Sequence, residues 1–186
     1  MTTKSILLTM AALLGVGTIY TAYVFTHAPI SPEVIDTQVD LVISERAFLE
    51  VYIPHLEAAV VAAQIVLEKG TRLRPLHDIA AKITEEKKME SEYLKARYQA
   101  LYGEYYTPTG AYISSLRDLT ELSQDEHERV FLEEMIRHHD ISVQLLQKSL
   151  NLQMDTELVE YSQKGIASAL VDISSLRDVS QLLPRD

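Results

Sequence analysis

Apolar residues recur every three or four positions through most of the chain beyond residue 36, which is the spacing of one helix face. The pattern is plainest in residues 131–146, FLEEMIRHHDISVQLL, where two adjacent stripes make the wide apolar face of a bundle helix. The stripes therefore predict a long packed helix that carries two histidines and a methionine. One stripe is Phe131, Met135, His138, Ser142 and Leu145, and the other is Leu132, Ile136, His139, Val143, Leu146 and Leu150.

Prolines, glycines and capping residues divide the first half of this pattern into two helices. The first is expected to begin near Ser31-Pro32-Glu33 and to end at Lys69, before Gly70. A kink or break is expected near Glu50–Pro54, because proline removes a backbone hydrogen bond. The second helix is expected to run from Pro75 to just before Gly103.

The second half predicts two further helices. Ser123 is a suitable N-cap for the third, which is expected to reach about Asn151. The fourth covers residues 155–183, where Gly165 indicates close helix packing or a weak point. The fold class is therefore all-α.

The two halves resemble each other at a constant offset of 83 residues. ERAFLE at 45–50 matches ERVFLE at 128–133, and the same offset pairs His55 with His138. We interpret this as a tandem helical hairpin, residues 36–102 and 119–185, with a pseudo-twofold axis. Both histidines should point into the bundle, where they can approach each other, and one hydrogen bond, for example to Tyr52, would satisfy a buried neutral imidazole.

The motif F-L-x-x-M-I-x-H-H, repeated in tandem behind an export signal, resembles the CopM-like family of periplasmic proteins over residues 36–183. The resemblance implies a ferritin-like antiparallel four-helix bundle, and it implies copper binding because several members bind copper. The family usually places another methionine one or two turns after the histidine pair, where this chain has Leu145 and Ala62.

Thioether and imidazole ligands at i, i+3 and i+4 share one helix face and suit copper. Met135, His138 and His139 have this spacing, and His55 is the candidate fourth ligand. The same residues also fit an ordinary packed helix with core histidines. No cofactor is therefore expected, with copper as the alternative.

The N-terminal segment is expected to anchor the chain in a membrane. Residues 6–25 carry no charge, and twenty such residues match the hydrocarbon core of a bilayer. Lys4 precedes them and no Lys or Arg follows until Arg46, which predicts a cytoplasmic N-terminus. We expect an anchor at 1–27, a linker at 28–35 and a periplasmic domain at 36–186, single-pass in the inner (cytoplasmic) membrane. A cleaved signal peptide is the rival interpretation.

Composition excludes several classes of function. The chain has no Cys, and its net charge of −10 disfavours nucleic acid as a partner. A carboxylate di-iron bundle needs Glu-x-x-His, and no histidine here has a glutamate three residues before it. No phosphate loop, G-x-S-x-G or H-E-x-x-H motif occurs, so we expect no enzyme.

The connection between the halves is rich in tyrosine, which is enriched at protein interfaces. Tyr102, Tyr105, Tyr106 and Tyr112 are therefore candidate partner-binding residues. The preferred hypothesis is an accessory or structural subunit that docks on an integral membrane complex of respiratory or photosynthetic type. The alternative is a periplasmic copper-binding protein that uses the Met-x-x-His-His site.

Overall fold

The described part of the chain is a bundle of four long helices. The computed structural model describes residues 38–110, 112, 114 and 116–183. A short helix, α2 (Gln38–Leu41), precedes the long helices α3 (Glu45–Lys69), α4 (Arg74–Tyr102), α5 (Gln124–Ser149) and α6 (Thr156–Ser180). All of them belong to one compact unit that begins at Asp36. The all-α class is thereby confirmed.

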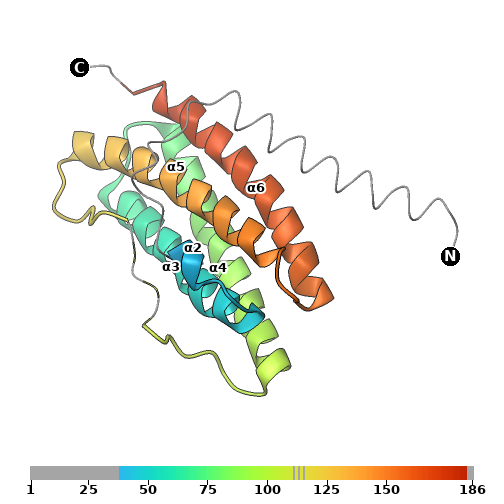
Figure 1. Ribbon diagram of the computed structural model, residues 1–186. Helices are drawn as coiled ribbons and strands as arrows, with labels where there is room; N and C mark the ends of the chain where they lie inside the picture. The colour runs from blue at the N-terminus through green and yellow to red at the C-terminus, as the bar shows by residue number, and fades with distance from the viewer. Residues whose placement is uncertain (1–37, 111, 113, 115, 184–186) are drawn as a thin grey trace, which may run out of the picture. The chain divides into compact units, whose positions relative to one another are not determined.

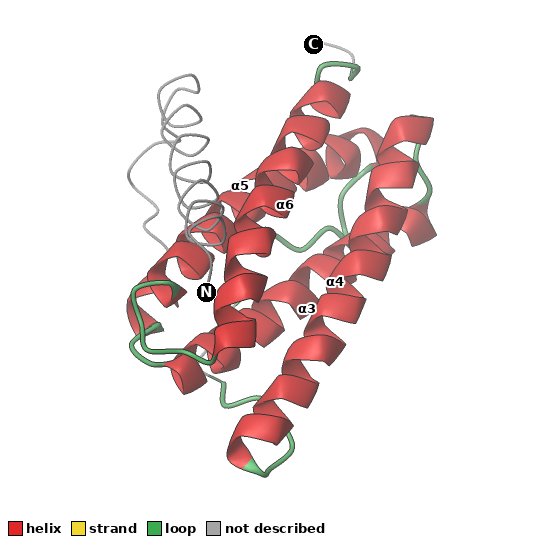
Figure 2. Ribbon diagram, turned by 90° about the vertical axis from the view of Figure 1, so that its right-hand side faces the viewer, coloured by secondary structure: helices red, strands yellow, loops and turns green. Residues whose placement is uncertain are grey.

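The long helices form two hairpins, α3 with α4 and α5 with α6, which pack against each other mainly through α3 and α5. Figure 2 shows the resulting bundle, and α4 and α6 are the less closely packed pair across it. The connection between α4 and α5 runs from one end of the bundle to the other (Figure 1). The facing helices α3 and α5 are the ones that carry His55 and His138.

The break predicted near Glu50–Pro54 is wrong, because α3 continues as a helix through Pro54. The alternative of a kink there stays a prediction. The helical run is interrupted instead at residues 42–44, between α2 and α3. There Ser44 adopts an extended conformation and its hydroxyl accepts a hydrogen bond from the Ala47 amide at 3.1 Å, which starts a new helix. The N-cap residue Ser44 thus marks the start of α3, whereas Pro54 inside the helix does not end it.

The predicted start near Ser31-Pro32-Glu33 lies outside the described residues. The other predicted boundaries agree with the structure to within a few residues. Ser123 caps α5 in a capping box with Glu126. Gly103 ends α4 in the left-handed conformation, with φ of 72°, which a residue with a side chain rarely adopts. Gly165 marks close packing, since a Cβ atom there would lie 3.0 Å from Leu146 Cδ1 on α5.

Two glutamates lock the hairpins together at equivalent places. Glu128 at the start of α5 accepts a hydrogen bond from the Arg72 amide just before α4, and Arg72 also bonds this carboxylate through its guanidinium. Glu45 at the start of α3 accepts one from the Asp155 amide just before α6. Each carboxylate thus caps the second helix of the other hairpin, and both donors and acceptors are related by the 83-residue offset.

The predicted membrane segment at 6–25 lies outside the described residues. Within the described part, α3 alone is long and apolar enough to cross a membrane, and over half of its apolar window is buried in the bundle. The burial identifies α3 as the core helix.

Candidate metal centre

His55 and His138 meet in the middle of the bundle. Their side chains are 0% and 2% exposed, so the expectation that both point inward is confirmed. The two rings stack in parallel, with centroids 3.7 Å apart and planes 6° from parallel. His55 on α3 thus packs directly against His138 on α5.

A serine determines which nitrogen of His55 carries the proton. Nε2 of His55 lies 2.7 Å from Ser142 Oγ, and the Ser142 hydroxyl donates its own hydrogen to the His138 carbonyl oxygen. Ser142 must therefore accept from a protonated Nε2, which leaves the lone pair of His55 on Nδ1. This buried Nδ1 has no hydrogen-bond partner among the described residues. The expected partner Tyr52 instead stacks on the His55 ring, at 5.6 Å between centroids.

No serine stands at the position equivalent to Ser142 for His138. Ser142 corresponds to Ala59 at the offset of 83, and alanine has no hydroxyl to accept from His138. Nδ1 of His138 is buried and has no hydrogen-bond partner within the described residues. The pair therefore holds two buried nitrogens, one on each ring, that no described residue satisfies. Such atoms are unusual and indicate either a cost in stability or a missing ligand.

Both imidazoles are neutral at physiological pH. Burial lowers the pKa of His55 to about 3, helped by the nearby charges of His139 and Lys87. Burial also holds the pKa of His138 well below its usual value, and the nearby His55 and His139 lower this pKa further. A neutral imidazole keeps a lone pair free to bind a metal ion.

His139 belongs to a different cluster. Its Nδ1 donates to the Met135 carbonyl oxygen at 2.8 Å, and its Nε2 lies 3.6 Å from Asp172 Oδ2 on α6. Asp172 in turn binds Lys82 at 2.6 Å and faces Lys87 at 3.9 Å. Burial alone would raise the pKa of Asp172, but His139, Lys82 and Lys87 outweigh it and lower the pKa to about 2.

The four predicted ligands therefore do not converge on one point. The i, i+4 spacing predicted that His139 would join Met135 and His138 as a ligand. Its two ring nitrogens instead face the Met135 carbonyl oxygen and Asp172, which lie outside the histidine pair. Met135 is fully buried and packs in the apolar core one turn before His138. No group of three or more His, Asp or Glu side chains in the described ranges could hold a metal ion. Of the predicted ligands, His55 and His138 are the two whose buried Nδ1 atoms have no hydrogen-bond partner among the described residues.

The tyrosine-rich connection packs largely onto the bundle. Tyr102 donates to Glu45 at 2.9 Å, Tyr106 packs edge-on against Tyr98, and Tyr112 contacts the His55 ring edge-on at 5.9 Å. Burial raises the pKa of Tyr106 to about 12. Tyr105 differs, because 79% of it is exposed. Of the four candidate partner-binding residues, Tyr105 is the one that the structure leaves at the surface.

A second polar cluster was not anticipated from the sequence. Lys87 is 6% exposed and binds Glu90 at 2.8 Å, and Glu90 accepts from the Tyr161 hydroxyl at 2.8 Å. The charge run around Lys87 is typical of a solvated helix face, so its composition gave no indication of burial. The i, i+3 spacing of Lys87 and Glu90 was the available signal.

Residues 104–180 match the family described as "Domain of unknown function (DUF305)". The bundle is similar to CopM in its Cu(I)-bound form, with 22% identity, a TM-score of 0.64, and 74% of this chain and 96% of that chain covered. It is similar to CopM in an Ag-bound form, with 20% identity, a TM-score of 0.64 and the same coverage.

A DUF305 fragment from Deinococcus radiodurans is similar as well, with 21% identity, a TM-score of 0.62, and 84% of this chain and 100% of that chain covered. No curated protein matches the chain significantly. At these identities the likeness shows that the DUF305 fold is shared. The resemblance drawn from F-L-x-x-M-I-x-H-H is thereby confirmed.

Proposed function

We propose that this protein binds a soft monovalent metal ion, Cu(I) or Ag(I), at the His55–His138 pair. The observation that carries the proposal is the pair of buried, unpartnered Nδ1 atoms on facing helices. CopM, which shares the fold, has been seen with copper and silver bound. The alternative interpretation of the sequence is therefore preferred to the accessory subunit.

Each residue has a definite part in this proposal. His55 and His138 offer neutral imidazole nitrogens, and the nearby Met135 offers a soft sulfur, which favours Cu(I) over harder ions. Ser142 holds His55 in the tautomer whose free lone pair is on Nδ1. The Asp172 cluster keeps His139 away from the pair. Two imidazoles suit an ion of low coordination number better than one that needs four to six ligands.

The test is a competition titration of the full-length chain in detergent with Cu(I) held by a chromophoric chelator. We expect one tight Cu(I) per chain and at least about a hundredfold weaker binding in His55→Ala with His138→Ala, since both imidazoles are ligands. His77→Ala is the control, because His77 is an exposed histidine at the surface, beside Asp78. Full retention of binding by the double variant would contradict the proposal.

We also propose that residues 6–25 anchor the protein in the membrane and that residues 36–186 lie in the periplasm. We further propose that the bundle is ferritin-like and that its two hairpins arose as a tandem repeat. The reciprocal bonds of Glu45 and Glu128 support the tandem repeat. An anchored bundle outside the cytoplasm would meet metal ions that enter the cell envelope.

The docking subunit remains a second candidate because of Tyr105, a large aromatic side chain that is 79% exposed. A tyrosine at the centre of an interface is often worth about 2 kcal/mol or more on truncation. Tyr105→Ala should therefore release the protein from any membrane complex with which it co-purifies in mild detergent. Unchanged co-purification would rule Tyr105 out as an anchor, and circular dichroism should show an intact bundle in either case.

A further inference from the structure

One end of the bundle exposes apolar side chains. Ile43 and Tyr105 are 77% and 79% exposed, more than any other large hydrophobic residue in the described part of the chain, and Leu41 is 42% exposed. Ile43 lies just before α3 and Tyr105 just after α4. Arg46 on α3 bonds Glu104 at 2.6 Å, so the two segments lie side by side. We call Leu41, Ile43 and Tyr105 the apolar end.

The opposite end of the bundle is charged. It is formed by the turn between α3 and α4 and by the segment before α5, which the bond from Lys69 to the Leu122 carbonyl oxygen brings together. Its exposed side chains include acids and bases. They are Lys69, Arg72, Arg74, Asp78, Asp118, Glu121 and Glu126. The two ends thus differ in polarity, and the apolar end is the one that suits a partner of low polarity.

Few charges accompany the apolar end. Glu104 is paired with Arg46, and Asp40 is the one charged residue in 38–44. An anionic surface would repel this carboxylate more than a zwitterionic one would. Tyrosine rings are enriched at the level of the lipid headgroups, and aliphatic side chains enter the boundary with the acyl chains. The chemistry of the apolar end therefore fits the surface of a zwitterionic bilayer.

The path of the chain favours the same partner. Residues 6–25 are the proposed membrane anchor, and residues 26–37 separate them from α2. A linker of these twelve residues reaches at most about 40 Å. It therefore keeps the start of α2 and α3 near the bilayer and gives the apolar end a high effective concentration at its surface.

We propose that the apolar end docks on the membrane surface, with Leu41 and Ile43 at the acyl boundary and the Tyr105 ring among the headgroups. The inference rests on the proposed anchor at residues 6–25. It assigns Tyr105 to lipid and not to a protein partner.

The test uses the full-length chain in nanodiscs of phosphatidylcholine, in which some lipids carry a nitroxide on the headgroup. Because the chain has no Cys, one introduced cysteine takes a bimane label at a chosen place. Ile43→Cys and Tyr105→Cys should each bring the label beside the nitroxide, which quenches its emission. We therefore expect a loss of emission at both positions.

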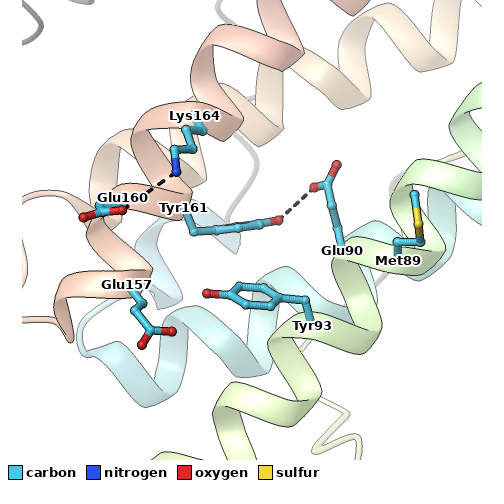
Figure 3. A pocket seen from close by; sticks show the side chains of 7 residues that line it. All are labelled: Met89, Glu90, Tyr93, Glu157, Glu160, Tyr161 and Lys164. Carbon is cyan, nitrogen blue, oxygen red and sulfur yellow. Dashed lines mark hydrogen bonds and ion pairs between the residues drawn. The ribbon is translucent and has the colours of Figure 1, made fainter.

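Two control positions lie away from the apolar end. Met89 is 59% exposed, beside the groove between α4 and α6 in which the Tyr93 and Tyr161 rings stack (Figure 3). A label at Met89→Cys therefore matches an exposed apolar position on the side of the bundle. Arg74→Cys places the label at the charged end. Neither label should lose emission when the nitroxide lipid is added.

A further variant measures the strength of docking. Ile43→Ser in the Tyr105→Cys chain removes one aliphatic side chain from the interface, so the ratio of docked to undocked bundle should fall about tenfold. Val61→Ser is the control, because Val61 is also β-branched and is 56% exposed on α3. It should leave the quenching of the Tyr105→Cys label unchanged, and circular dichroism should show an intact bundle in both variants.

The outcomes separate the docking of this end from the anchor. A chain that does not enter the nanodiscs would overturn the anchor, and the docked end with it. Entry with quenching at residues 43 and 105 no stronger than at residues 74 and 89 would overturn the docking and leave the anchor standing. Tyr105 would then remain a candidate contact for a protein.

Discussion

Acidification from pH 7 to pH 5 should lower the free energy of unfolding of the bundle by about 4 kcal/mol through His55 and His138 alone. In the unfolded chain both imidazoles bind a proton as the pH falls through their ordinary pKa of about 6.5. In the folded chain they stay neutral, since burial lowers the pKa of His55 to about 3 and holds that of His138 well below its usual value. The unfolded state therefore binds more protons, so stability rises with pH across this window and is lost as the pH falls.

Urea unfolding at a series of pH values measures this dependence. The double variant His55→Leu with His138→Leu cannot take up these protons, because leucine does not titrate. Its free energy of unfolding should therefore fall by about 4 kcal/mol less between pH 7 and pH 5 than that of the parent. His77→Leu should keep the parental slope, since His77 is exposed at the surface. A double variant with the parental slope would show that the pair is protonated in the folded state.

Glu128→Ala should destabilise the bundle by about 3 kcal/mol, because it removes a buried carboxylate that accepts hydrogen bonds from the amide and guanidinium of Arg72. The Glu128 side chain is 0% exposed, so the lost bonds are not replaced readily by water. The Arg72 side chain is 43% exposed, so the ion pair contributes less to the expected loss than the bond to the Arg72 amide.

The control is Glu133→Ala on the same helix, where the carboxylate is 53% exposed and pairs with Arg117 and Arg129 at the surface. We expect a change within about 0.5 kcal/mol there. Glu128→Gln should recover part of the loss, because an amide oxygen still accepts from the Arg72 backbone. Equal effects of Glu128→Ala and Glu133→Ala would show that the reciprocal caps do not hold the hairpins together.

The helices and their buried faces could be predicted from the sequence because both depend on local information. The apolar stripe through Phe131, Met135 and His138 has the helical period, and all three side chains are buried. Gly70, Gly103 and Ser123 act at the ends of helices, where the chemistry of one residue decides the boundary. The offset of 83 pairs His55 with His138 in the sequence, and the two rings stack on each other in the bundle.

The composition of the candidate site was decided by tertiary structure. His139 has the right spacing to join Met135 and His138, but Asp172 on α6 lies beside its Nε2 and draws it into another cluster. Ser142 became a partner of His55 because α3 crosses α5 at that residue. The sequence by itself determined the helices, their inward faces and the histidine pair. Which side chains share a hydrogen bond across helices depends on crossing points and rotamers, and only the packed bundle decides these.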